Sequence, residues 1–281
     1  MKNILILVFA SLLFTACEKI VDVDIPSGES RLVVEGLIST VNEPWMVKLS
    51  LSQPYLDQSE LSTIESAAVS IVGTDGSDVL LNHTDTGTFV SADPQRCIIG
   101  EEYTLKIVYD GEEYTASGTV PNAFPIDTIA SYYLPDNNGF IPAGYYVFIQ
   151  GKENVATGDY YLFKPYLNDS MMGAEIDNDE FGSVSYLNED FDSEKILEEL
   201  ALGKTPRPFP FTVEPGDTVR VEQFAISREY YQFIIDRNAQ LNRGGTPFDA
   251  PPANPNYNIS NGALGYFSVA YKDEATVVIE E

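Results

Sequence analysis

Short alternating strands separated by turn residues dominate this sequence and constrain its fold more than any other feature. Residues 45–51 and 103–109 place an apolar side chain at every second position, which is the period of a strand with one buried face. Asp110-Gly111 follows the second of these strands, and an Asp-Gly pair between two alternating segments is a strong hairpin signal. About seven such strands lie between residues 31 and 121 at roughly ten-residue spacing, which predicts an immunoglobulin- or transthyretin-like β-sandwich.

Residues 126–281 predict a second β-rich domain with one or two helices, after a proline-containing junction at residues 121–125. A short helix is predicted at residues 193–202. A clearer helix begins after Ser227, whose hydroxyl suits an N-cap, and places Tyr230, Ile234 and Leu241 along one side. The expected fold class is therefore mainly β, in two domains. Strand patterns in the second domain occur at residues 126–133, 145–150, 159–166, 218–225, 266–271 and 275–279.

The N-terminus has the features of a bacterial lipoprotein signal peptide. A basic residue precedes an apolar run of about 11 residues, which is shorter than the roughly 20 that a transmembrane helix needs. Phe14-Thr15-Ala16 then stands directly before Cys17. Cleavage of residues 1–16 would leave the Cys17 thiol acylated, with chains such as palmitate, at the head of a polar tether over residues 17–30. An ordinary secretory signal peptide is the alternative interpretation.

The charge balance limits what the protein binds. Acidic residues outnumber basic residues by 43 to 16, which gives a net charge of −27. A body this acidic repels nucleic-acid phosphates and anionic lipid headgroups. We therefore expect no nucleic-acid partner, and we expect membrane attachment to come from the lipid anchor alone. A hydrophobic content of 44% is sufficient for packed cores.

Candidate catalytic residues are few. His83 is the only histidine, lies beside a turn, and has no accompanying G-x-S-x-G nucleophile motif. Cys97 is the only cysteine besides Cys17, and its apolar strand context predicts a buried, inert thiol. We predict that the protein is not an enzyme. A hydrolase that uses two of the many carboxylates is the alternative, since sequence spacing cannot test such a pair.

An acidic segment at residues 175–182 is the candidate metal site. Asp177 and Asp179 match the first and third positions of an EF-hand calcium loop. Phe181 and Asn188 occupy the fifth and twelfth positions, where that loop has Asp or Asn and Glu. A solvated acidic loop is therefore the favoured interpretation. The expected cofactor is none, with Ca²⁺ at Asp177 and Asp179 as the alternative.

Two features suggest a surface for a ligand or partner. The chain has 17 tyrosines, several in adjacent pairs, and neighbouring strand residues point to opposite faces. One tyrosine of each strand pair should therefore be buried and the other exposed. Ordinary packing and coverage of the sheet surface is the favoured interpretation of these tyrosines, and a surface for sugar stacking or a partner interface is the alternative. A proline- and asparagine-rich loop follows the second helix and precedes an aromatic strand. The candidate surface residues are Tyr132, Tyr145, Pro251, Pro252, Asn254 and Tyr266.

Several segments together resemble one known family. They are Leu32-Val-Val-Glu-Gly36, Tyr103-Thr-Leu105 before Pro121, and the late segments Gly245-Thr-Pro-Phe248, Pro251-Pro-Ala-Asn254 and Gly265-Tyr-Phe267. With the lipoprotein signal, this pattern resembles the Bacteroidota lipoproteins catalogued as domain of unknown function four-two-four-nine. The resemblance implies no reaction and no catalytic residues.

The same resemblance implies a place in the cell. Members of that family are often encoded near TonB-dependent outer-membrane receptors, which is an association rather than a physical argument. The expected function is a non-enzymatic accessory or binding component beside such a receptor, anchored in the outer membrane on its periplasmic or its cell-surface face. A glycan-binding adhesin is a second alternative to this function, along with the hydrolase.

Overall fold

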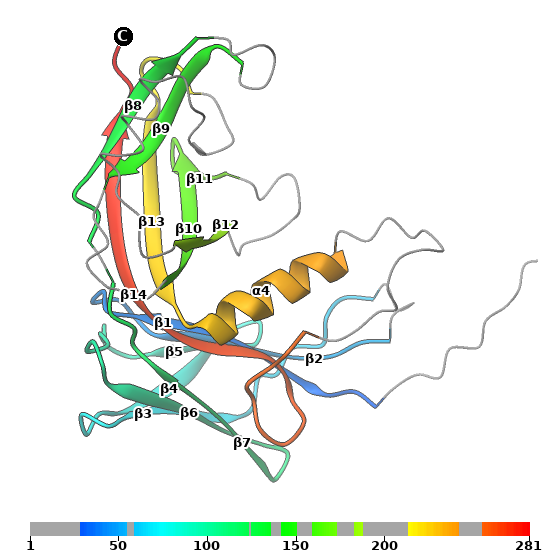
Figure 1. Cartoon of the computed structure of the whole chain (residues 1–281). Coiled ribbons are helices and arrows are strands. Elements are labelled where there is room, and N and C mark those ends of the chain that lie inside the picture. The colour runs from blue at the N-terminus through cyan, green and yellow to red at the C-terminus, as the bar shows by residue number, and fades with distance from the viewer. Residues whose placement is uncertain are drawn as a thin grey trace, which may run out of the picture.

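The computed structural model describes most of the chain downstream of the predicted tether (Figure 1). The described residues are 29–54, 59–123, 125–135, 142–150, 159–172, 213–241 and 255–281, together with the backbone of 183–187. Several sequence-based predictions lie outside these residues. They are the signal peptide, Cys17 and most of the tether, the helix at 193–202, and the candidate residues Asp177, Asp179, Pro251, Pro252 and Asn254.

The predicted N-terminal strands are present, and local turn residues connect them. Asp110 and Gly111 have φ angles of 50° and 80°, the left-handed geometry that a two-residue hairpin turn requires. Thr86 and Gly87 turn the chain with positive φ between the fourth and fifth strands. The strands are β1 (Leu32–Ser39), β2 (Met46–Leu51), β3 (Ala68–Gly73), β4 (Asp78–Asp85), β5 (Thr88–Ser91), β6 (Glu102–Tyr109) and β7 (Glu112–Thr119).

The second half of the chain adds strands and one long helix among the described residues. The two strands expected at residues 266–271 and 275–279 are one strand, β14 (Leu264–Val278). The remaining elements are β8 (Thr128–Leu134), β9 (Gly144–Gln150), β10 (Asp159–Leu167), β11 (Ser170–Met171), β12 (Ser183–Leu187), β13 (Thr218–Ile226) and α4 (Arg228–Leu241). The mainly β fold class is thus confirmed.

Strand β14 joins the two parts of the molecule into one continuous sheet. The strand order is β11-β10-β13-β14-β1-β2-β5-β4-β3-β6-β7, with β12 also paired to β10 and β8-β9 forming a separate hairpin. The first half of β14 pairs in parallel with β1, and its second half pairs antiparallel with β13. In Figure 1, β14 runs from the N-terminal strands up into the β10-β13 part of the sheet.

The C-terminal segment therefore contributes to the N-terminal core. The sequence-based domain boundary at residues 121–126 does not anticipate this contribution. Phe267 and Val269 of β14 are buried in the same cluster as Val34, Trp45 and Tyr103. Val269 packs against Gly118 of β7, where an added Cβ would lie 3.0 Å from a Val269 methyl. This contact packs β7 against β14, although the two strands are not neighbours in the sheet order. Parallel pairing between distant segments leaves no local sequence signal, because each strand shows only its own alternation.

Helix α4 begins where Ser227 predicts. The Ser227 hydroxyl oxygen accepts a hydrogen bond from the Tyr230 amide at 3.1 Å, which is the N-cap arrangement. Tyr230 and Ile234 are buried against β10 and β14, as their spacing predicts. The side chain of Leu241 is not among those described. Within the described residues, no helix is long and apolar enough to span a bilayer.

Candidate functional site

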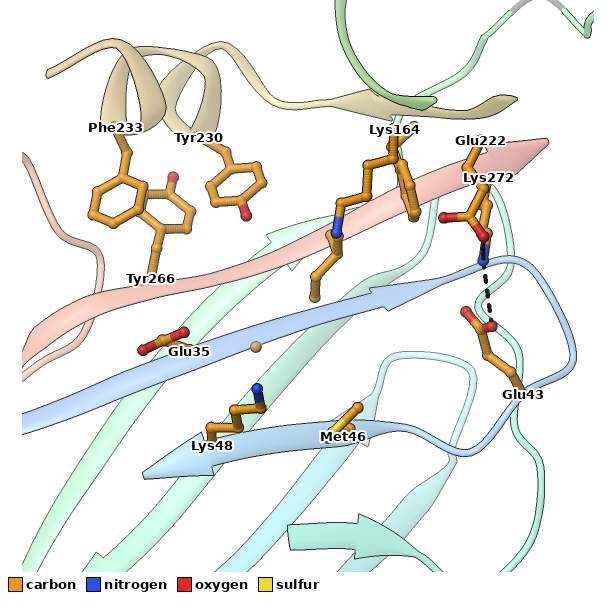
Figure 2. A pocket seen from close by; sticks show the side chains of 13 residues that line it. Glu35, Glu43, Met46, Lys48, Lys164, Glu222, Tyr230, Phe233, Tyr266 and Lys272 are labelled. Carbon is orange, nitrogen blue, oxygen red and sulfur yellow. Dashed lines mark hydrogen bonds and ion pairs between the residues drawn. The ribbon is translucent and has the colours of Figure 1, made fainter. Parts of the chain in front are cut away.

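A cleft lies in the corner where the continuous sheet passes from β1 and β2 to β10 and β13 (Figure 2). It has a volume of about 280 Å³. Helix α4 contributes the aromatic end, and six of the lining side chains are charged. The lining residues are Glu35, Gly36, Leu37, Glu43, Met46, Lys48, Lys164, Glu222, Phe224, Tyr230, Phe233, Tyr266 and Lys272.

The floor of the cleft is the outer face of β1 and β2. Val47 and Leu49 point into the sandwich core, so the alternate residues Met46 and Lys48 point outward. Glu35 lies directly opposite Lys48 in the strand pairing and is exposed on the same face. Strand alternation alone therefore places a carboxylate, a thioether and an ammonium group on the floor.

An ion network forms the opposite end of the cleft. Lys272 lies 3.3 Å from a Glu222 carboxylate oxygen and 3.5 Å from one of Glu43. The side chains of Lys272 and Glu222 are only 11% and 12% exposed. Arg220 donates to Glu222 at 2.7 Å, and its guanidinium lies 3.9 Å from the centre of the Tyr166 ring. These contacts cross β13, β14 and the loop before β2, so they stabilise the corner that forms the cleft.

The network keeps Glu222 ionised. Burial by itself would raise the pKa of Glu222, but the nearby Lys272 and Arg220 outweigh burial, and the pKa is lowered from its usual 4.5. Tyr166 also donates a hydrogen bond to Glu222, at 3.2 Å. Hydrogen bonds and opposite charges both favour the charged form of a carboxyl. Glu222 is thus a fixed negative charge at neutral pH.

Three aromatic rings form the wall at the α4 end. The Tyr266 ring lies 4.9 Å from that of Tyr230 and 5.1 Å from that of Phe233, measured between centroids. All three side chains are buried. Burial raises the pKa of the Tyr266 phenol, with an opposing hydrogen bond to Ser227 and a further increase from Glu229. The wall is therefore a packed, preformed surface rather than a set of exposed stacking faces.

A family profile described as "Domain of unknown function (DUF4249)" matches residues 18–276. The chain belongs to this family. The match includes every element that forms the cleft, from β1 to Lys272 in β14. The family description assigns no reaction. No curated protein matches the chain.

Two solved structures are similar to parts of this chain. One is a two-domain fibronectin type III segment of chicken tenascin, at 13% identity and a TM-score of 0.20, with 71% of this chain and 90% of that chain covered. The other is a DUF4785 family protein from Legionella pneumophila, at 14% identity and a TM-score of 0.20, with 69% and 52% covered. Similarities this weak carry no argument about the function of this chain.

The structure separates the tyrosines that the sequence analysis grouped as a surface. Tyr132 pairs with Tyr146 and Tyr133 with Tyr145, so Tyr132 and Tyr145 lie on opposite faces of the β8-β9 hairpin. Tyr266 lies elsewhere, in the cleft wall. The three candidates therefore do not form one surface. Tyr133, which is not one of the candidate surface residues, is 59% exposed beside Tyr145, with ring centroids 5.3 Å apart.

The described end of the proline- and asparagine-rich loop is docked onto the fold. The Asn258 amide donates to the Phe267 carbonyl at 2.8 Å, and its oxygen accepts from the Phe267 amide at 3.0 Å. The Asn258 side chain thus satisfies both backbone hydrogen-bonding groups of Phe267, as a neighbouring strand would. Asn256 contacts Asp236 of α4 at 3.4 Å. These contacts favour a structural role for residues 255–259.

The remaining chemical candidates are structural or solvent-facing. Cys97 is buried, and burial, with a contribution from Asp75, raises the pKa of its thiol to about 12. The burial that the sequence predicts is thus confirmed, but Cys97 lies in the segment between β5 and β6 and not in the expected strand. His83 is exposed, with its ring 5.4 Å from that of Phe89. Among the described residues, no group of three or more His, Cys, Asp or Glu side chains is placed to hold a metal ion.

Sequence reasoning missed the charged residues of the cleft. Lys48 could have been assigned to an exposed face from the alternation of residues 45–51. Lys164 and Glu222 are directly opposite in the β10-β13 pairing, and Phe224 is opposite Lys272 in the β13-β14 pairing. These pairings join segments that are distant in the sequence, so no local spacing signal identifies them.

Removing the Lys272 charge should destabilise the protein in a pH-dependent way. We expect Lys272→Met to lower the free energy of unfolding by about 2 kcal/mol at pH 7, because Glu222 would keep a buried charge with one cationic partner fewer. A carboxyl with a lowered pKa contributes stability above its unfolded pKa and loses it as pH falls through the folded pKa. The deficit of the variant should therefore shrink below about pH 4.5.

Urea unfolding at several pH values measures this deficit. Lys106→Met is the matched control, because Lys106 is an exposed residue of β6 outside the cleft. A deficit that stays constant from pH 7 to pH 3 would contradict the role assigned to Glu222.

Proposed function

We propose that this protein is a membrane-anchored, non-enzymatic accessory component that works beside a TonB-dependent receptor of the outer membrane, with the cleft as its binding surface. The cleft is the observation that carries the binding role. It combines a preformed aromatic wall, an ion network and outward-facing charges in one concave site of about 280 Å³. Concave sites with an apolar lining and a few convergent polar groups are the usual form of a binding site.

The charge state of Glu222 favours binding over hydrolysis. A hydrolase with two carboxylates needs one carboxyl with a raised pKa, so that it can donate a proton near neutral pH. The pKa of Glu222 is lowered. Glu43 lies 3.5 Å from the same Lys272 and so belongs to the same ion network. The lowered pKa of Glu222 therefore suits a fixed ion network and not proton transfer.

A glycan-binding adhesin remains the second candidate, favoured by a separate observation. Tyr133 and Tyr145 form an edge-to-face pair on the β8-β9 hairpin, and Tyr133 is largely exposed. An exposed tyrosine face offers a sugar ring a stacking surface. Tyr133→Ala should abolish glycan binding under this alternative and leave it unchanged under the main proposal.

A native pull-down tests the accessory role. Tagged protein is purified from membranes solubilised in a mild detergent, and mass spectrometry identifies what accompanies it. We expect a TonB-dependent receptor with the unmodified chain and with Lys106→Glu, and a loss of that receptor with Lys48→Glu, which reverses a charge on the cleft floor. Recovery of no membrane partner, under conditions that keep such complexes intact, would refute the accessory role.

A further inference from the structure

We propose that a cavity at the open end of the N-terminal sandwich, the end cavity, binds a small organic cation, with its apolar body against two tyrosine rings and its ammonium or guanidinium group at two carboxylates. The tyrosines are Tyr109 and Tyr114, and the carboxylates are Asp110 and Glu112. The end cavity and the cleft share no lining residue. The inference thus adds a second binding site to the role proposed for the cleft.

The end cavity opens between two pairs of strands, at the point where the predicted tether joins β1. Leu32 and Leu51 line it from β1 and β2, and Tyr109 and Tyr114 line it from β6 and β7. The segment before β14 lines a further side, next to the β6-β7 turn (Figure 1). The cavity has a volume of about 660 Å³, which lies within the range of small-molecule sites, roughly 300–1,000 Å³.

Strand alternation gives the end cavity its aromatic lining. Leu105 and Ile107 are buried in the core, so Tyr109, two residues further along β6, lies on the same inward face. Tyr114 lies opposite Ile107 in the β6-β7 pairing and shares that face. Both tyrosines are half-buried against the core. A tyrosine ring attracts a cation through its π face, and more strongly where the cation is partly desolvated.

Negative charge predominates in the lining of the end cavity. Its charged residues are Glu29, Arg31, Asp110 and Glu112. Arg31 is held toward the segment before β14, because its Nε donates to the Gly262 carbonyl at 2.6 Å and its guanidinium lies 5.5 Å from the centre of the Tyr257 ring. The Asn261 amide donates to one Glu112 oxygen at 3.1 Å, which fixes that carboxylate at the rim. This excess of carboxylates, on a chain with a net charge of −27, attracts a cation and repels an anion.

Three indole compounds test the inference on the full chain carrying Cys17→Ser, which needs no detergent if the thiol is the lipid anchor. Tryptamine, tryptophol and indole-3-acetate carry the same ring with a positive, a neutral and a negative group. Equilibrium dialysis at about 0.15 M salt, where distant exposed charges are screened, measures the dissociation constant of each. We expect tryptamine to bind at least about tenfold more tightly than tryptophol, and indole-3-acetate to bind more weakly than tryptophol.

The double variant Asp110→Asn/Glu112→Gln should remove this preference for the cation. Asn-Gly suits the same hairpin turn as Asp-Gly, and the glutamine oxygen can still accept from Asn261. Asp78→Asn/Glu113→Gln is the matched control, because it removes two exposed charges outside the cavity lining and leaves the same net charge. This control should keep the preference of the unmodified chain.

Tyr114→Leu tests the aromatic part of the site. Leucine has no π face, so the ratio of tryptamine affinity to tryptophol affinity should fall about threefold. Fluorescence of the buried Trp45, measured without the indole compounds, reports whether each variant is folded.

Four results would overturn the inference. They are equal binding of the three compounds, a cation preference that the double variant at Asp110 and Glu112 retains, a preference that the control variant loses equally, and an unchanged ratio in Tyr114→Leu. If the double variant loses the receptor in the pull-down and tryptamine does not bind selectively, the end cavity serves a protein partner and the small-cation inference fails. Selective tryptamine binding that depends on Asp110 and Glu112 supports the inference whether or not the pull-down recovers a receptor.

Discussion

Gly265→Ala should destabilise the protein by at least about 3 kcal/mol, a large part of the roughly 5–15 kcal/mol that stabilises a typical fold. Gly265 has a φ of +90°, and an added Cβ would lie 2.0 Å from the Val34 carbonyl oxygen and 2.9 Å from the Val34 amide nitrogen. Both contacts are with backbone atoms, which cannot rotate away. Val34 and Gly265 are partners in the parallel β1-β14 pairing, so the substitution would force apart the strands that join the two parts of the molecule.

Gly216→Ala is the matched control for the backbone strain in this prediction. Gly216 has a similar φ of +97°, but an added Cβ would meet no atom within 4 Å. Its substitution should cost only about 1–2 kcal/mol, the cost of a left-handed conformation for alanine. Urea unfolding followed by Trp45 fluorescence measures both variants, because the only tryptophan lies in the core that β14 completes. Equal losses of stability in the two variants would refute the contact with Val34.

Cys17→Ser should move the protein from the membrane fraction to the soluble fraction. The proposed anchor is the acylated thiol, and stable attachment requires more than one lipid chain. With a net charge of −27, the protein has no electrostatic attraction to anionic headgroups that could replace those chains. Fractionation and incorporation of labelled palmitate measure the effect.

Cys97→Ser is the control for the lipid anchor. Cys97 is buried and its pKa is raised to about 12, so it is not available for acylation. This variant should keep the location and the label of the unmodified chain. A Cys17→Ser protein that loses its signal peptide but stays in the membrane fraction would show that Cys17 is not the anchor.

Much of the local structure could be predicted because its signals are local. Alternation identifies β2 and β6, Asp110-Gly111 identifies the turn after β6, and Ser227 identifies the start of α4. Each of these signals acts over a few residues, within one strand, one turn or one cap. The buried state of Cys97 follows from its apolar neighbours in the same way.

The pairings that build the cleft could not be predicted. The β1-β14 pair joins segments from opposite ends of the described chain, and alternation in either strand is compatible with many partners. The register of β8 and β9 places Tyr145 beside Tyr133 rather than Tyr132, and a shift of one residue would reverse that result. Lys48, Lys164 and Glu222 line the same cleft only because the long-range pairings β1-β14, β13-β14 and β10-β13 occur together.

The sequence by itself determined the mainly β class, most of the individual strands and turns, the start of α4 and the outward position of Lys48, since each depends on neighbouring residues. It also carries the lipoprotein signal on which the proposed anchor at Cys17 depends. Only the tertiary structure decided that β14 completes the N-terminal core and that the cleft collects its lysines beside a packed aromatic wall. The physical reason is that long-range strand pairing depends on the fit of whole faces, which no short segment encodes.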